Sequence, residues 1–220
     1  YAFRIMFGLL PAFYFFGYFL YWTIAYYGFG VEPQWELAMN IVMGVFLVFT
    51  LPFFTFISKR ISPGVGDNLI VSSAAVALSG YLGKQMNLSN TRVILASMDA
   101  EESGLRGAKA FCEKNEAKLK KVPTYALIVD GIYHMEDLQL LTHDINGFVP
   151  LSKEMALEIQ EIGKKCGYEL PLIRMPFGGG ATDAAEFHRI GVETTTLIGI
   201  ASNWVRDQLH YHTSRDTPDK

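Results

Sequence analysis

The chain has 220 residues, the length of one ordinary domain, with 50% hydrophobic residues, 19% charged residues and a formal net charge of −3. Because soluble domains carry about 25% charged residues, this composition is more apolar than average, and it excludes a disordered or low-complexity chain. The small negative charge gives no basic field, so we expect no nucleic-acid partner. Two cysteines, Cys112 and Cys166, are too few to build a disulfide framework.

The charged and aromatic residues divide the chain into two parts. Residues 1–57 contain only three charged residues but 20 of the 30 aromatic ones. Within this part, residues 5–29 and 37–57 are two uncharged, apolar segments. Since a helix needs about 20 apolar residues to cross a bilayer, the sequence predicts a two-helix transmembrane hairpin over residues 1–60, with the lipid bilayer as its partner.

The flanking charges indicate how the hairpin is oriented. Arg4 precedes the first apolar segment, and Lys59 and Arg60 follow the second, whereas the connector at residues 30–36 has no lysine or arginine. Positive residues favour the cytoplasmic side of a membrane, so we expect both ends of the hairpin and everything after Arg60 to face the cytoplasm. The alternative is a pair of core helices in a large soluble protein, which would rarely stay uncharged over this length.

From residue 61 onward, the pattern is that of a soluble α/β domain. Strand-like apolar runs alternate with helix-like segments, which favours a layered α/β sandwich. The predicted strands cover residues 92–98, 125–129, 138–141, 172–175 and 194–200, and the predicted helices cover residues 68–82, 104–120, 152–165 and 182–190. The first of these helices is rich in alanine and leucine, so we expect it to be buried over much of its surface.

Four acidic residues and one histidine lie where the predicted elements begin or end. Asp67 lies in a turn before the first helix, Asp130 ends a strand, and His212 lies in the C-terminal loop. Glu101 and Glu102 follow closely after the first predicted strand. Ligands collect outside the carboxyl ends of strands in an open α/β sheet, and converging carboxylates repel one another unless a cation holds them. These residues therefore predict a divalent metal site.

Taken one at a time, the same residues have ordinary structural explanations. Asp67 could cap the helix that follows it, and Glu101 and Glu102 could form the acidic first turn of a helix. Asp130 could belong to an ordinary turn, and His212 could be a loop histidine. Only their order along the chain and their shared position at strand ends favour a common site.

One segment, MDAEESGLRGAKAF at residues 98–111, carries the most specific pattern in the chain. Further patterns accompany it in order: GVGDN at 64–68, LIVDG at 127–131, GGGATDAAEFHRIGVETTTL at 178–197 and HYHTSRDTPDK at 210–220. Together, residues 62–220 resemble the family-28 metallopeptidases, the co-catalytic zinc aminopeptidase family, which also contains glutaminyl cyclases. The resemblance implies a three-layer α/β/α sandwich with a mixed sheet, of the zinc aminopeptidase type, over residues 61–220.

The resemblance also implies a metallo-aminopeptidase, anchored in the membrane by the hairpin, that hydrolyses N-terminal residues from peptides with a free N-terminus. Its cofactor would be zinc, in two ions, although the same ligands accept other divalent metals. Glu101 would be the general base that takes a proton from a water activated between the two ions, and Asp183 would lie beside the site. The implied metal ligands are Asp67, which bridges the two ions, Glu102, Asp130 and His212.

The family also has a His-x-Asp segment upstream of the bridging aspartate, and nothing like it lies between Tyr1 and Asp67. We therefore expect residues 61–220 to be a catalytic domain that is incomplete at both ends, with the missing histidine ligand before Tyr1. The hairpin would then be an insertion between two ligand segments of one domain. The alternative is that the histidine is absent, which would leave a one-metal or weakened site.

Three other functions fit parts of the sequence. A glutaminyl cyclase-like acyltransferase would use the same fold with a single zinc, but such enzymes usually carry extra sequence after the glutamate pair, where GLRG follows almost directly here. A non-catalytic membrane scaffold with a peptidase fold tends to lose ligands, whereas these site residues are present. A transport or lipid-handling protein is disfavoured because the two apolar segments contain no charge that could line a substrate path.

Overall fold

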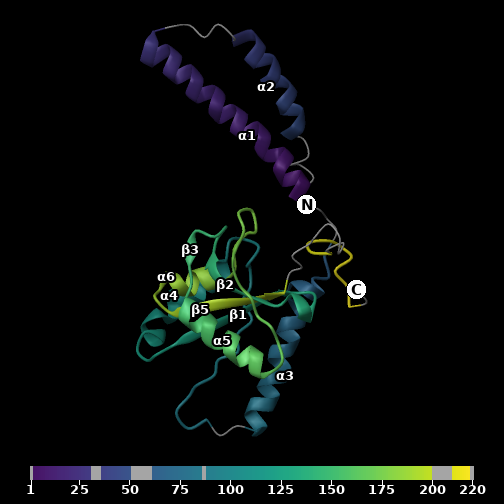
Figure 1. Cartoon of the computed structure of the whole chain (residues 1–220), viewed down its shortest axis with the longest axis vertical. Coiled ribbons are helices and arrows are strands. Elements are labelled where there is room, and N and C mark those ends of the chain that lie inside the picture. Colours follow the sequence, from purple (N-terminus) through teal and green to yellow (C-terminus); the bar gives the residue numbers. More distant parts are fainter. Residues whose placement is uncertain (1, 31–35, 51–60, 86–87, 200–209, 219–220) are drawn as a thin grey trace. The chain divides into compact units, whose positions relative to one another are not determined.

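The computed structural model describes residues 2–30, 36–50, 61–85, 88–199 and 210–218 (Figure 1). The chain forms two compact units, Tyr1–Ile61 and Ser62–Lys220. The described part of the first unit is helical, and the second unit combines a sheet with helices.

The first unit contains two apolar helices that pack against each other. Helix α1 spans Ala2–Thr23 and continues into a π-helical turn, η1, at Ile24–Gly28, while α2 spans Glu36–Thr50. The predicted helix over residues 5–29 is therefore confirmed. The helix predicted over residues 37–57 is confirmed as far as Thr50, and its remainder lies outside the described residues.

Two tyrosines of α1 join the helices. The hydroxyl of Tyr14 donates to the backbone oxygen of Met39 at 2.8 Å, and that of Tyr18 donates to Oδ1 of Asn40 at 3.0 Å. These bonds satisfy polar groups on otherwise apolar helices. Most of the large apolar side chains remain exposed, Phe19 by 75%, so the hairpin has an apolar surface that water does not favour.

By length and composition, two helical stretches among the described residues can cross a bilayer, Leu9–Gly28 and Val65–Lys84. The apolar stretch Glu36–Val48 is shorter. The first and the third belong to the two predicted spans. The second lies in the unit that the sequence assigned to the soluble domain, and its packing there is described below.

The second unit is built on a five-stranded mixed sheet with the strand order β1-β5-β2-β3, in which β4 pairs with β2. β1 runs parallel to β5 and β4 runs parallel to β2, but β2 runs antiparallel to β5. The predicted mixed sheet is confirmed, and four of its predicted strands are found close to their expected bounds. The strands are β1 (Tyr125–Ile132), β2 (Gln139–Asp144), β3 (Val149–Pro150), β4 (Leu172–Arg174) and β5 (Glu193–Gly199).

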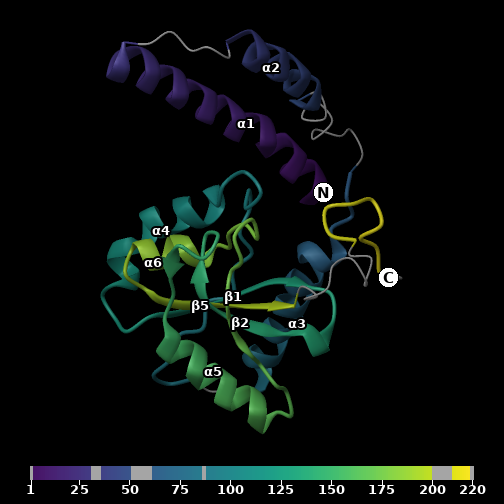
Figure 2. The same cartoon turned by 45° about the horizontal axis from the view of Figure 1, so that its top comes forward.

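Helices cover both faces of this sheet, which gives the predicted three layers (Figure 2). On one face, α4 (Arg106–Leu119) packs against α6 (Ala184–Arg189), and on the other lies α5 (Lys153–Lys165). Helix α3 (Ile70–Gln85) follows a π-helical turn, η3 (Val65–Leu69), and packs against β1. All four helices predicted for this unit are confirmed.

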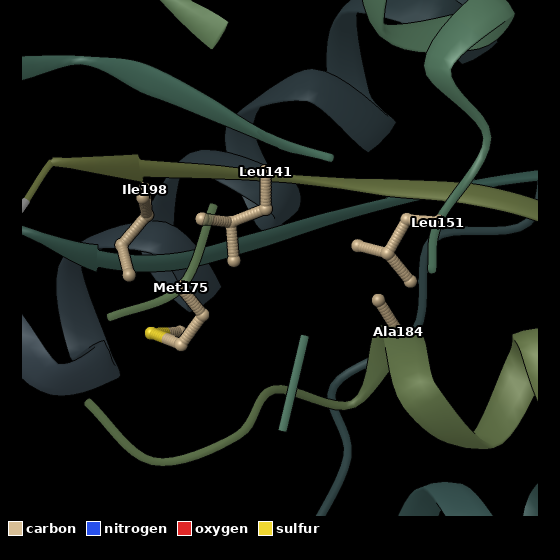
Figure 3. Packing of buried hydrophobic residues seen from close by; sticks show 5 residues of the cluster. All are labelled: Leu141, Leu151, Met175, Ala184 and Ile198. Atoms are coloured by element: carbon tan, nitrogen blue, oxygen red, sulfur yellow. The ribbon is translucent and has the colours of Figure 1, made fainter. Parts of the chain in front are cut away.

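Successive residues of β2 point to the two helical layers. Leu140 packs with Ala156 of α5, whereas Leu141 packs with Met175 and with Ala184 of α6 (Figure 3). Both leucines are fully buried, as the alternation of side chains along a strand requires for a sheet covered on both faces. This double core holds β2 between the two helical layers.

One predicted strand is wrong. Residues 92–98 form no strand, and Val93, Ile94 and Leu95 are exposed. A strand needs a neighbouring ladder, and no described residue pairs with this segment. Its β-branched, apolar composition indicated a strand, but composition cannot supply the partner.

The expected burial of the first helix of this unit is also wrong within the described residues. Helix α3 exposes most of its large apolar side chains, with Val76 exposed by 72% and Tyr81 by 57%. It packs mainly against β1 and η3, so only a small part of its surface is covered by described elements. The helix is where the sequence placed it, but burial depends on neighbours and not on helix composition.

Replacing a leucine in this core tests the layered packing. We expect Leu140→Ala to lower the free energy of unfolding by about 2–5 kcal/mol, because it leaves a cavity between β2 and α5. The same substitution at Leu157, which lies on α5 and is 45% exposed, should change it by about 0.5 kcal/mol or less. Urea denaturation of the full chain in detergent measures both, and equal losses would contradict the assignment of Leu140 to the core.

Candidate metal centre

Asp67 is positioned by the tight turn that leads into α3. Gly64 has a φ of +64°, which favours glycine, and a Cβ on Gly66 would lie 2.3 Å from the ring of Tyr133. Asp67 itself has non-helical backbone angles, φ −127° and ψ 88°, and a cis peptide bond joins it to Asn68. The two glycines thus allow a turn that carries a half-buried carboxylate against β1.

The glutamate pair lies in the loop before α4. The backbone N–H groups of Gly104 and Leu105 donate to the carbonyl oxygen of Glu101 at 2.9 and 2.8 Å, which closes the loop into a turn. Leu105 adopts a positive φ of 57° at the junction with the helix. Glu101 is half-buried in this turn, and Glu102 is exposed. The pair follows the segment that was predicted as a strand, and the structure shows no strand there.

Asp130 lies near the end of β1, where the pairing with β5 becomes irregular between Asp130 and Ile132. The side-chain amide of Asn68 donates to the carbonyl oxygen of Val129 at 3.0 Å and to Oδ1 of Asp130 at 3.1 Å. The residue that follows Asp67 therefore ties the turn to the strand end, across 62 positions of sequence.

The imidazole of His212 faces two carboxylates. Its Nε2 lies 3.3 Å from Oδ2 of Asp67 and is in contact with Oε1 of Glu102. One ligand atom from each of these three residues lies within 4.8 Å of the others. The structure thus brings together side chains from η3, from the loop before α4 and from the C-terminal loop.

Burial and neighbouring charges shift the pKa values of Glu101, Asp130 and His212. Burial raises the pKa of Glu101 from 4.5 to about 8, and the charges of Asp130 and Glu102 add to this. Burial also raises the pKa of Asp130 from 3.8 to about 7, with a further contribution from Asp67. For His212, burial lowers the pKa, but hydrogen bonds with Asp67 and Glu102 outweigh burial and raise the pKa to about 9. The cluster therefore holds carboxylates that repel one another.

Asp183, at the start of α6, takes part in the same electrostatic cluster. Burial raises its pKa from 3.8 to about 6, with contributions from Asp144 and Glu186. Its charge in turn raises the pKa values of Glu101 and Asp130. Oδ1 of Asp183 is buried and has no hydrogen-bond partner among the residues that the structure describes. Such an oxygen calls for a donor, a water or a cation.

The donor set fits a divalent cation. Carboxylate oxygens and an imidazole nitrogen are ligands that zinc accepts, and a cation would relieve the repulsion among the carboxylates. Three predicted ligands, Asp67, Glu102 and His212, lie in one cluster. Asp130 is outside that cluster and is linked to it through Asn68 and through its charge.

Sequence reasoning missed two residues that contact the segment of Asp67. The carboxylate of Asp216 accepts a hydrogen bond from the backbone N–H of Gly66 at 2.8 Å and from the hydroxyl of Tyr133 at 3.0 Å. Burial and the neighbouring Asp216 raise the pKa of Tyr133 well above its ordinary value, so its hydroxyl stays a donor. The one available signal was that Asp216 lies four positions after His212 in the C-terminal segment.

Comparison with known proteins gives a family and a set of similar folds. The family model described as Peptidase family M28 matches residues 54–220. The fold is similar to BSAP, a zinc aminopeptidase from Bacillus subtilis, with 21% identity and a TM-score of 0.55. It is also similar to the LapA aminopeptidase of Legionella pneumophila, with 16% identity and a TM-score of 0.55. An aminopeptidase from Aneurinibacillus sp. strain AM-1 is 22% identical with a TM-score of 0.54.

These structural matches cover most of this chain but less than half of each similar protein. They include 73%, 74% and 72% of this chain, and 38%, 43% and 35% of the Bacillus, Legionella and Aneurinibacillus chains. No curated protein sequence matches the chain. The comparisons therefore concern the fold of one part of these larger proteins.

The raised pKa values make the stability of the metal-free protein dependent on pH. Between pH 4.5 and about 8, Glu101 holds a proton in the folded state that it releases on unfolding. Asp130 does the same between pH 3.8 and about 7. Stability should therefore be greatest below this window and fall as the pH rises through it. His212 acts in the same direction, since its contribution is complete below 6.5 and is lost as the pH passes about 9.

We expect the urea concentration at the unfolding midpoint of the metal-free full chain to decrease as the pH is raised from about 5 to about 8. The decrease should be smaller in Glu101→Gln, which has no carboxyl group at that position. Glu158→Gln, on the exposed face of α5, is the matched control and should keep the full fall. A midpoint that rises over this range would contradict the electrostatic description of the cluster.

Proposed function

The chain belongs to peptidase family M28, and we propose that it is a zinc-dependent aminopeptidase that removes the first residue of peptides with a free N-terminus. The observation that carries the proposal is the meeting of Asp67, Glu102 and His212 within 4.8 Å, next to a glutamate with a raised pKa. Each of these residues comes from a segment that resembles the family, and their convergence is what a metal centre requires.

We propose that four residues hold the metal: Asp67, Glu102, Asp130 and His212. Asp67 contacts His212 directly and is joined to Asp130 through Asn68, so it is suited to lie between two ions. When bound, zinc supplies positive charge that lowers the pKa of water and polarises a peptide carbonyl.

Glu101 is the residue that we propose to move the proton. In the metal-free chain the pKa of Glu101 is raised to about 8, and the positive charge of bound zinc would lower it toward neutral pH, where a carboxylate can accept a proton and return it. Its oxygen would take the proton from the water whose oxygen attacks the carbonyl carbon. The same carboxyl would then give that proton to the nitrogen of the leaving amine as the C–N bond breaks.

The surrounding charges favour a substrate with a positive N-terminus. Asp130 and Asp183 both act on Glu101, and the buried Oδ1 of Asp183 is available for a donor. A free α-ammonium group is a donor with the complementary charge. This supports exopeptidase action at the N-terminus over cleavage within a chain.

We further propose that residues 1–60 anchor the peptidase in a membrane. Helix α1 is long and apolar enough to cross a bilayer, and Tyr18 satisfies Asn40 within the hairpin. The equally apolar stretch Val65–Lys84 is not a further span in this proposal. Its third residue is Asp67, and the next residue, Asn68, is hydrogen-bonded to the end of β1.

Replacing the proposed proton carrier separates chemistry from metal binding. We expect Glu101→Gln to retain zinc and to hydrolyse an aminoacyl nitroanilide at least about 100-fold more slowly than the wild type, because the amide cannot accept the proton. Glu158→Gln is again the control and should keep full activity.

A zinc-loaded Glu101→Gln variant with normal activity would contradict this role. Release of a cyclised product from a peptide with N-terminal glutamine, in place of free glutamine, would instead identify a glutaminyl cyclase.

The exposed Cys166 allows a test of topology without adding a label site, since Cys112 is buried. With the second unit in the cytoplasm, a membrane-impermeant maleimide should label Cys166 in inside-out vesicles and not in intact cells. Cys166→Ser should abolish the labelling. Labelling of intact cells would reverse the proposed orientation, and recovery of the chain in the soluble fraction would contradict the membrane anchor.

A further inference from the structure

A buried carboxylate outside the proposed ligand set connects three segments of the second unit. Asp216 is only 3% exposed. Its Oδ1 accepts from the backbone N–H of Gly66 at 2.8 Å, and its Oδ2 accepts from the backbone N–H of Asp67 at 3.3 Å and from the hydroxyl of Tyr133 at 3.0 Å. Two donors belong to the turn that carries Asp67, and the third follows β1.

The C-terminal loop is tied to the same turn at further points. The backbone N–H of Val65 donates to the carbonyl oxygen of Asp216 at 3.3 Å. The hydroxyl of Ser62 donates to the carbonyl oxygen of Thr213 at 2.8 Å. His212 directly precedes Thr213, so the loop that presents its imidazole is held by hydrogen bonds to the segment that presents Asp67.

Tyr133 adds a steric constraint to its hydrogen bond. Its ring lies so close to Gly66 that a Cβ there would be 2.3 Å from the ring. The ring therefore supports the backbone of the turn while the hydroxyl donates to Asp216. A ring with no hydroxyl would keep the first contact and lose the second.

We propose that Asp216 and Tyr133 are positioning residues that hold the Asp67 turn and the His212 loop at the separation that a shared metal ion requires. Asp67 and Asp216 lie 149 positions apart in sequence, so this spacing is set by the folded structure and not by the local chain. The carboxylate of Asp216 makes strong, charge-assisted hydrogen bonds because it accepts from three donors while shielded from water. This inference rests on the proposed function, because it takes Asp67 and His212 to be metal ligands.

A purely structural role would affect stability but not metal affinity, so the two must be measured separately. In the full chain in detergent, zinc affinity is measured by competition with a chromophoric chelator, and stability is measured by urea denaturation of the metal-free protein. We expect Asp216→Asn to weaken zinc binding about 10–100-fold, the usual cost of losing an outer partner of a metal ligand.

Tyr133→Phe is the milder variant, since it keeps the ring against Gly66. It should weaken zinc binding about 10-fold, the lower end of that range, and it decides the question if Asp216→Asn does not fold. The matched control is Thr195→Val, which removes a buried hydrogen bond from Thr195 to the carbonyl oxygen of Leu141, 2.8 Å long, within the sheet. It should lower stability and leave zinc affinity unchanged.

The positioning role would be overturned if Tyr133→Phe bound zinc as tightly as the wild type. It would also be overturned if Thr195→Val lost as much zinc affinity as Tyr133→Phe. Either result would leave the proposed function intact. Failure of the wild-type chain to bind zinc would overturn the proposed function, and the positioning role with it.

Discussion

Electrostatic repulsion among carboxylates is the constraint on which the second unit depends. Asp67, Glu101, Glu102 and Asp130 come from three separate segments, and burial together with the neighbouring charges raises the pKa of Glu101 to about 8 and that of Asp130 to about 7. A fold gains nothing from such an arrangement unless a cation or a proton offsets it. The sheet, the turn before α3 and the C-terminal loop together hold these groups where they would otherwise move apart.

Hydrogen bonds to the backbone and to uncharged groups counter that repulsion. Asn68 links the turn of Asp67 to the end of β1, and Asp216 links the same turn to the C-terminal loop. Neither link uses a side-chain oxygen of Asp67, while Asn68 also donates to Oδ1 of Asp130 and so orients a second proposed ligand. The site is therefore shaped by neighbours of the ligands, and the core around Leu140 and Leu141 keeps β2 in place beside β5.

Features that depend on nearby residues could be predicted from the sequence, whereas features that depend on distant partners could not. The amphipathic α5 was predicted because its apolar residues recur with the helical period, and the structure adds a cap, Ser152, which accepts from the Met155 N–H. Residues 92–98 were wrongly predicted as a strand because pairing depends on a partner that composition does not reveal. The ligand candidates were found from motif order, whereas Asp216 lies within the C-terminal pattern but was given no role, because its donors on Gly66, Asp67 and Tyr133 are distant in sequence.

The central claim is that the carboxylate and histidine cluster is a metal centre. A crystal of the zinc-loaded chain, measured at the zinc absorption edge, locates the metal directly by anomalous scattering. The claim requires an anomalous peak about 2.0–2.2 Å from carboxylate oxygens of Asp67 and Glu102 and from a ring nitrogen of His212. An anomalous peak elsewhere in the molecule, with these three side chains free of metal, would contradict it.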